Sequence, residues 1–383
     1  MIYTIGAFRG EIVVPHSQPI PGNETIPLEL TAMGLRQEYI EGRDLRDRYP
    51  DLISENYEVE EIFVRSTNLN RTIMSAQAQM MGLYASNPHK LNEVQLAHAI
   101  PPVSLSIDPR IISELHDSPL PFDMEIVPIH VYSAANDMFS SEGCPMAKQD
   151  NVDTETKSAE VVAIIETNKA LIEDITTTLG FLVEEYEWPK FREILWSTTA
   201  ALFNQDPLPL TQKQIEDLNG LANQLYPFRY EKSSYLTLLS SRCAKEINDT
   251  LEKTKERNSL ENVKFEFVSL DYDVFMAFLH EFDIAHEGIT PFGANFIIEV
   301  YSSPNTKQYL RGTDKEEEEI DKKHKKKPLK FKYLMQEVKL PGCGDKDGDS
   351  CTIGNFYKLV KTKIKQGKFD YKKDCQIPEE EEE

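Results

Sequence analysis

The sequence lacks the features that mark several large classes of protein. No apolar run reaches the roughly 18 residues needed to span a bilayer. Its 42 basic residues are outnumbered by 64 acidic ones, which gives a formal charge of −22. The motifs GxxxxGKS/T, GxGxxG, CxxC and HExxH are absent. Because nucleic acids bind basic surfaces, the acidic charge predicts no nucleic-acid partner. The lack of a long apolar run predicts no transmembrane segment, and the lack of these motifs leads us to expect no metal and no cofactor.

The composition is that of a globular protein. The chain has 383 residues, of which 40% are hydrophobic and 28% charged. This length allows two domains, or one domain with a large insertion.

The cysteines and glycosylation sequons give conflicting signals about the compartment. Three sequons begin at Asn23, Asn70 and Asn248, and together with paired-looking cysteines they favour an oxidising space. Met1 is followed directly by strand-like sequence. Neither the basic region nor the apolar region of a signal peptide is present, so we expect no signal peptide. The compartment is therefore left open. The odd set of five cysteines is Cys144, Cys243, Cys343, Cys351 and Cys375.

Strand and helix patterns alternate along residues 1–100. An apolar helical pattern follows a capping Thr31, a buried strand is expected over 59–65, and the next helix is expected over 67–83. This β-α-β-α order predicts an α/β fold with a mainly parallel sheet flanked by helices.

A helical insertion interrupts this pattern before it resumes. Residues 101–135 are proline-rich and irregular, and helical patterns dominate from about 150 to 225. The later expected elements are a helix over 234–256, a strand over 263–269, a helix over 274–282 and a strand over 291–302. We therefore predict an α/β core (1–100 and 230–375), an irregular segment with a helical cap (101–229) and an acidic tail (376–383).

Four blocks of sequence resemble the histidine acid phosphatase family, which has a phosphoglycerate-mutase-like fold. They are LTAMGLRQEYIEG with LRDRY (30–49), EIFVRSTNLNRTIMSA (61–76), PFGANFIIEVY (291–301), and KLPGC with CTIGNF (339–356). The resemblance implies a histidine nucleophile in an RHGxR loop after the first strand. It also implies arginines around the phosphoryl oxygens and a distal His-Asp pair whose aspartate protonates the leaving group.

The expected nucleophile loop contains no histidine in any register. With Gly10 matched to the motif's glycine, Arg9 replaces the nucleophile, and the two arginines become Phe8 and Ile12. If the motif is moved back by one residue, Phe8 replaces the nucleophile, Ala7 the first arginine and Glu11 the second. A deletion lets Arg9 stand for the first arginine but leaves no histidine. Neither phenylalanine nor charged arginine attacks phosphorus, and Glu11 would repel an anion.

The distal motif is also altered. Where the family has a His-Asp pair, Asp271 replaces the histidine and Tyr272 replaces the aspartate. His280 and His286 lie too far along to fill the role, and we interpret them as helix-end residues. The first histidine of the chain, His16, lies well beyond the nucleophile loop.

Arg65 is retained where the family has an arginine of the phosphate pocket. One interpretation is residual anion binding. The other, which we favour, is a structural pair with a nearby carboxylate, for which the substitutions nominate Glu11 or Asp271.

The resemblance also implies how the cysteines pair. Cys144 matches a family cysteine that pairs near the C-terminus, here with Cys375. Cys343 and Cys351 would close a short loop, which leaves Cys243 as a buried small hydrophobe.

These losses favour a catalytically inactive member of the family that serves as a structural or interaction subunit of a larger assembly. Losing the nucleophile alone removes most catalysis. Two alternatives stay open: a phosphomonoester hydrolase with a rearranged site using Asp271 or His16, and an anion-binding module using Arg65 and possibly Arg9. The charged segment 314–327 and the acidic tail are the candidate partner surfaces.

Overall fold

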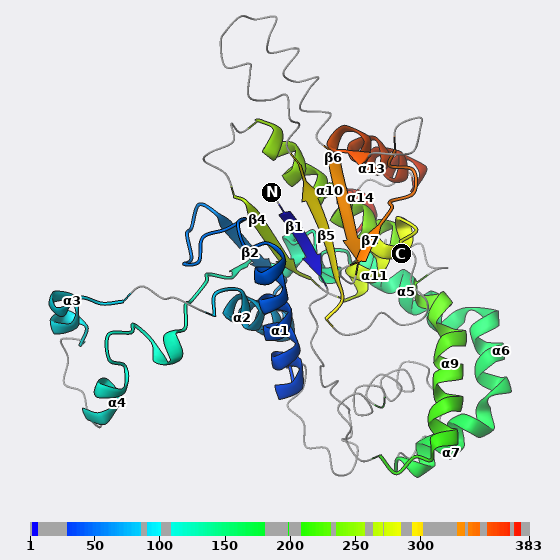
Figure 1. Cartoon of the computed structure of the whole chain (residues 1–383). Coiled ribbons are helices and arrows are strands. Elements are labelled where there is room, and N and C mark those ends of the chain that lie inside the picture. Colours follow the sequence, from blue (N-terminus) through cyan, green and yellow to red (C-terminus); the bar gives the residue numbers. More distant parts are fainter. Residues whose placement is uncertain are drawn as a thin grey trace, which may run out of the picture.

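The computed structural model places eight strands in one sheet with helices on both faces (Figure 1). It describes residues 2–6, 29–85, 90–100, 109–180, 198, 208–230, 235–256, 263–270, 272–284, 293–301, 328–333, 336–344, 351–367 and 371–376. The segment 7–28, Asp271, His286, the charged segment 314–327 and the acidic tail from residue 377 lie outside this set.

The sheet has the strand order β3-β2-β4-β1-β5-β6-β7, with β8 also paired to β6. The pairs β3–β2, β2–β4 and β4–β1 are parallel, whereas β5, β6, β7 and β8 add in antiparallel pairs. The predicted α/β class is confirmed, and its parallel part is these four strands. The strands are β1 Ile2–Gly6, β2 Ile62–Ser66, β3 His130–Val131, β4 Phe265–Ser269, β5 Asn295–Val300, β6 Pro328–Tyr333, β7 Gln336–Val338 and β8 Cys351–Thr352.

The helices cover both faces of the sheet, and some lie beyond its lower end in the view of Figure 1. None of the described helices is both long and apolar enough to cross a membrane. They are α1 Ala32–Arg48, α2 Asn70–Leu83, α3 Glu93–His98, α4 Pro109–Glu114, α5 Pro145–Lys157, α6 Ala159–Thr167, α7 Lys169–Thr178, α9 Gln212–Tyr230, α10 Tyr235–Glu256, α11 Tyr272–Glu281, α13 Ile353–Gly367 and α14 Tyr371–Asp374.

Alternating strand residues feed two separate apolar clusters. Phe296 and Ile298 of β5 pack with α10, α11 and α13, whereas Ile297 between them packs with α1 and α2. This two-residue period is what a strand buried on both faces requires.

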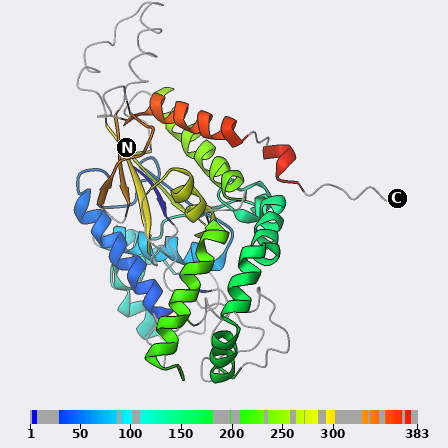
Figure 2. The ribbon, with the colours of Figure 1, turned by 90° about the vertical axis from the view of Figure 1, so that its right-hand side faces the viewer.

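The helical insertion has an apolar cluster of its own. All of its buried members fall within residues 161–228, on α6, α7 and α9 and at Leu179, which caps the C-terminal end of α7. In both ribbon views these helices extend on the side to which the parallel strands point (Figures 1 and 2). The boundaries 101–229 for the whole insertion remain a prediction.

Most of the expected elements are present, with shifted ends. Thr31 caps α1 as predicted, since the amide of Gly34 donates to its Oγ1 (3.1 Å). The next helix starts at Asn70 rather than Thr67, because the Thr67 amide donates to the Ser269 carbonyl (3.0 Å) and continues the strand edge. The stretch 101–135, expected to be irregular, contains the short helix α4.

The helices α1 and α2 touch backbone to backbone. A Cβ on Gly42 would collide with the carbonyl of Gln79, and one on Gly82 would collide with the carbonyl of Tyr39. The guanidinium of Arg46 closes the far end by donating to the Leu83 carbonyl (2.8 Å). Only glycine permits this approach, so the two glycines set how closely α1 packs on α2.

We predict that Gly42→Ala lowers the free energy of unfolding by about 1–3 kcal/mol, because the backbones must separate. Gly220→Ala in α9 is the matched control. A Cβ there meets nothing within 4 Å, and alanine should stabilise the helix by up to about 1 kcal/mol. Urea unfolding of both variants measures this, and equal effects would contradict the close packing.

Candidate functional site

The carboxyl ends of β1, β2 and β4 meet at one edge of the sheet. Gly6 and Ser66 are both in register with Ser269, the last residue of β4. The expected nucleophile loop and Asp271 follow these strand ends but lie outside the described residues, as does His16. Arg65 is the one retained pocket residue whose surroundings are described, and it precedes the last residue of β2.

Arg65 is held by two carboxylates. Its Nη2 donates to Asp137 Oδ1 (2.5 Å) and its Nη1 to Glu246 Oε1 (3.0 Å). The Arg65 side chain is 8% exposed and that of Asp137 is fully buried. Burial is the largest influence on Asp137 and raises its pKa, while the guanidinium opposes that rise. The guanidinium is thus committed to protein partners on two of its nitrogens.

Two aromatic rings complete the surroundings of Arg65. Its guanidinium carbon lies 4.3 Å from the ring centre of Tyr132 and 4.7 Å from that of Phe139. Cations over aromatic faces are stabilised further, more so when desolvated. The charge is therefore enclosed by rings as well as by acids.

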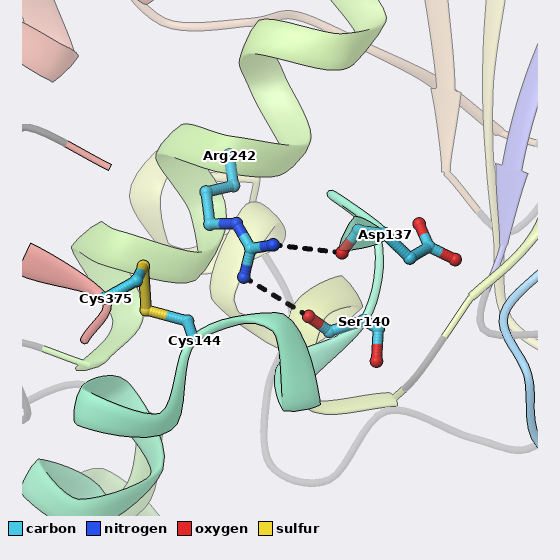
Figure 3. The surroundings of a disulfide bond; sticks show 5 residues. All are labelled: Asp137, Ser140, Cys144, Arg242 and Cys375. Atoms are coloured by element: carbon cyan, nitrogen blue, oxygen red, sulfur yellow. Dashed lines mark hydrogen bonds between the residues drawn. A yellow bond between two sulfur atoms is a disulfide. The ribbon is translucent and has the colours of Figure 1, made fainter. Parts of the chain in front are cut away.

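The segment that carries Asp137 is itself fastened to α10. Arg242 donates from Nη2 to the carbonyl of Asp137 (3.0 Å) and from Nη1 to that of Ser140 (3.5 Å), as Figure 3 shows. The amide of Phe139 donates to Asp137 Oδ1 (2.9 Å), which orients the carboxylate. The same segment ends at Cys144, which is bonded to Cys375. Asp137 is thus placed by contacts from three distant parts of the chain.

Among the described residues, two carboxylates pair with Arg65, and the pairing with Glu11 or Asp271 nominated by the sequence stays a prediction. Glu11 and Asp271 are outside the described residues, and the partners found are Asp137 and Glu246, 72 and 181 residues away. No local spacing links an arginine at a strand end to acids so far along the chain. The general prediction of a carboxylate partner agrees with the geometry of the described residues.

The residue at the position of the family's leaving-group acid points into the core. Tyr272 begins α11, is buried, and belongs to the apolar cluster beneath the sheet. A buried phenol in an apolar cluster is poorly placed to protonate a leaving group. His280, in the last turn of α11, has its Nε2 3.1 Å from the hydroxyl of Tyr226, which fits the predicted helix-end role.

Sequence reasoning missed a partly buried acid near the same edge. Glu41 of α1 accepts from Gln79 Nε2 (3.1 Å) and is hydrogen-bonded to Asn295, which is in register with Gly6. Burial raises the pKa of Glu41 to about 8, aided by the nearby Asp44. The neighbouring Gly42, which lies against α2, is the sequence signal that could have drawn attention to it.

Both predicted disulfides are present. Cys144 bonds to Cys375 and Cys343 to Cys351, while Cys243 is free and buried, as expected. Burial raises the pKa of the Cys243 thiol, so it stays protonated. The sequons differ in access: the Asn70 side chain is exposed, whereas Asn248 is buried on α10. Within the described residues no three acidic, histidine or cysteine side chains form a metal cluster.

Comparison with known proteins identifies the family. The model of the histidine phosphatase superfamily (branch 2) matches residues 20–313, well over half of the chain. The chain belongs to this superfamily. The matched region begins after β1 and after the expected nucleophile loop.

Individual relatives and structures agree with this assignment. Lysosomal acid phosphatase of Xenopus laevis is 46% identical over 56 residues, which span 15% of this chain and only 13% of that enzyme. Prostatic acid phosphatase of Bos taurus is 22% identical over 365 residues, 91% of this chain and 79% of the relative. Phytases from Klebsiella sp ASR1 (TM-score 0.56, 13% identity, 99% and 98% of the two chains) and Citrobacter braakii (0.58, 10%, 94% and 97%) share the fold.

The Arg65–Asp137 pair gives a stability prediction. Asp137→Asn should lower the free energy of unfolding by about 3–5 kcal/mol, because it strips a buried guanidinium of its nearest countercharge. Asp44→Asn is the matched control, since it breaks an exposed i,i+4 pair with Arg48 that contributes about 0.5 kcal/mol or less. Chemical denaturation at neutral pH compares them, and a small loss for Asp137→Asn would contradict the pairing.

Glu41 gives a pH prediction. Its pKa is raised in the folded state, so the native chain holds a proton that the unfolded chain releases above about pH 4.5. Stability should therefore fall as pH rises from about 4.5 to 8 and level off above that. Glu41→Gln should remove this fall. The free energy of unfolding of the variant, relative to that of the native chain, should therefore be higher at pH 8 than at pH 5 by about 1 kcal/mol or more. A constant difference between the two pH values, measured by urea unfolding, would refute it.

Proposed function

We propose that this chain is a catalytically inactive member of its superfamily and serves as a structural or interaction subunit of a larger assembly. The observation that carries the proposal is the pairing of Arg65 with Asp137 and Glu246. An arginine that binds a phosphoryl group must offer its donors to the ligand. Here two of its nitrogens already donate to carboxylates, and those carboxylates would repel the incoming anion.

Three features of the sequence and fold support the loss of chemistry. The loop after β1 has no histidine in any register. Asp271 stands where the distal histidine belongs. The position of the leaving-group acid holds Tyr272, which is buried in an apolar cluster. Because nucleophile, acid and arginines act as a unit, the three changes together remove the basis of the family's mechanism.

The two alternative functions rest on less. A hydrolase with a rearranged site needs Asp271 or His16 as nucleophile, and an anion-binding module needs a free guanidinium on Arg65. The closed surroundings of Arg65 disfavour the second. Arg9, the other cation nominated for anion binding, lies outside the described residues.

The decisive experiment is a phosphatase assay on purified chain. We expect no turnover of an aryl phosphate above a blank between pH 4 and 8, with bovine prostatic acid phosphatase as the positive control. Turnover that disappears in Asp271→Asn or His16→Asn would instead establish the rearranged hydrolase. Acid-quench trapping with a labelled substrate and mapping of any phosphorylated residue would identify the nucleophile.

Thermal shift with inorganic phosphate tests the anion-binding alternative separately. We expect the same unfolding temperature with and without millimolar phosphate, because Arg65 is already neutralised. The matched variant is Glu246→Gln, which frees one guanidinium nitrogen while keeping the size of the side chain. Stabilisation of the native chain by phosphate that is lost in Arg65→Lys would contradict the closed pocket.

A further inference from the structure

One stretch of this acidic chain is strongly basic. Residues 351–376 contain seven lysines and two aspartates, whereas the whole chain has a formal charge of −22. The stretch comprises β8, α13 and α14. A concentration of positive charge in a negative chain produces a local field that attracts anions. The lysines are Lys358, Lys361, Lys363, Lys365, Lys368, Lys372 and Lys373.

Helix α13 buries its apolar side and exposes lysines on the other side. Ile353, Phe356 and Val360 belong to the apolar cluster that also contains residues of α10 and α11. Lys358 and Lys361 are exposed, as the 3.6-residue period of a helix with that buried side requires. Figure 2 shows α13 along the outside of the molecule next to α10. The basic side of α13 is therefore open to a partner.

The lysine of α13 that faces α11 is neutralised within the protein. The ammonium of Lys363 donates to the backbone carbonyl of Glu281. It also lies 3.7 Å from the Glu281 carboxylate and 3.8 Å from that of Asp283. This side of the helix thus has acids of its own.

The outward lysines differ, because no carboxylate in the part of the chain that the structure describes forms an ion pair with Lys358, Lys361 or Lys373. The ammonium of Lys361 lies over the ring of Tyr357, 5.5 Å from its centre. Lys358 and Lys361 are three positions apart on the helix, a spacing at which like charges repel each other. An anionic partner would relieve this repulsion.

Disulfides fasten the basic stretch near both of its ends. Cys351, which begins β8 just before α13, is bonded to Cys343. Cys375, which directly follows α14, is bonded to Cys144. A surface held in this way loses little conformational freedom when a partner binds, so more of the attraction appears as affinity.

The distribution of charge decides what kind of anion fits. A bilayer or a nucleic-acid duplex is a broad polyanion, and it would meet the rest of the acidic chain together with α13. A second copy brings a formal charge of −22, so self-association is opposed. A single acidic segment can lie along the roughly 22 Å of α13. Because salt screens charges beyond roughly 8 Å, such a narrow ligand is attracted mainly by the lysines beside it.

We propose that the outward side of α13 and α14, marked by Lys358, Lys361 and Lys373, binds an acidic segment of another protein. This rests on the proposed function only in naming the chemistry of an interaction subunit's partner. An active phosphatase could carry the same surface, so the binding experiment and the phosphatase assay fail independently.

The test uses the full chain and a labelled synthetic peptide, as long as α13, in which glutamates recur every third or fourth residue among alanines. Fluorescence anisotropy should show binding that weakens as sodium chloride is added. In the double variant Lys358→Glu, Lys361→Glu the affinity should fall about ten-fold or more, because two attractive charge pairs become repulsive.

The matched control is Lys157→Glu, Lys213→Glu, which changes the net charge by the same amount. These two side chains, on α5 and α9, are 71% and 77% exposed. The control should bind the peptide as the native chain does. No binding to the native chain, equal weakening in both double variants, or equal affinity for a peptide with lysines replacing the glutamates would overturn the proposal.

Acetylation of lysine amines, mapped by mass spectrometry, locates the contact. The peptide should protect Lys358 and Lys361 and leave Lys157 and Lys213 as reactive as before. Protection of the second pair alone would contradict the proposed surface.

Two further measurements test other occupants of the lysines. Vesicles containing anionic phospholipid should not retain the native chain, and a chain ending at residue 376 should bind the peptide as tightly as the full chain. Retention by vesicles without peptide binding would assign the lysines to a membrane and overturn the proposal. Peptide binding only by the shortened chain would assign them to the chain's own acidic tail, which also overturns it.

Discussion

The structure depends on keeping one buried positive charge neutral. Arg65 sits near the carboxyl end of β2, where a family member would place a phosphoryl group against it, and its side chain is almost wholly buried. An isolated buried guanidinium costs several kcal/mol in desolvation, so it needs partners close by. The fold supplies them from the 137–144 segment and from α10, and that requirement fixes how these parts meet. The Cys144–Cys375 bond and the contacts of Arg242 hold the segment in position.

The same requirement supports the proposal that Arg65 does not bind phosphate. Anion binding needs cations whose donors are unoccupied and whose neighbours are not acidic. A phosphate placed about 4 Å from Asp137 would meet a repulsion on the order of 4 kcal/mol at an effective dielectric constant of 20. Arg65 alone cannot both satisfy that carboxylate and hold an anion. On the proposed function, the guanidinium of Arg65 binds carboxylates of the protein in place of a ligand.

What the sequence predicted well is local or carried by family resemblance. The Thr31 cap is a contact over three residues, and the strand and helix periods around β2 and α11 arise from burial of neighbouring positions. The cysteine pairing follows from the family's pattern. The partners of Arg65 were not predictable, because a chain-wide ion pair has no spacing rule and several acids were equally plausible. Glu41 was missed for a different reason: an acid inside an amphipathic pattern is usually assigned to the solvent face.

The position of Arg65 also links the strand ends of the candidate site to the edge of the sheet. A residue at a strand end can act on either side of the strand's edge, toward a ligand or toward the next strand. The guanidinium that pairs with Asp137 and Glu246 also lies over the ring of Tyr132, the residue that follows β3. An edge strand of only two residues has few hydrogen bonds of its own to keep it straight. One guanidinium therefore both pairs with the buried carboxylates and contacts the residue next to the edge strand. Loss of its ion pairs would affect the stability of the core and the geometry of the edge together.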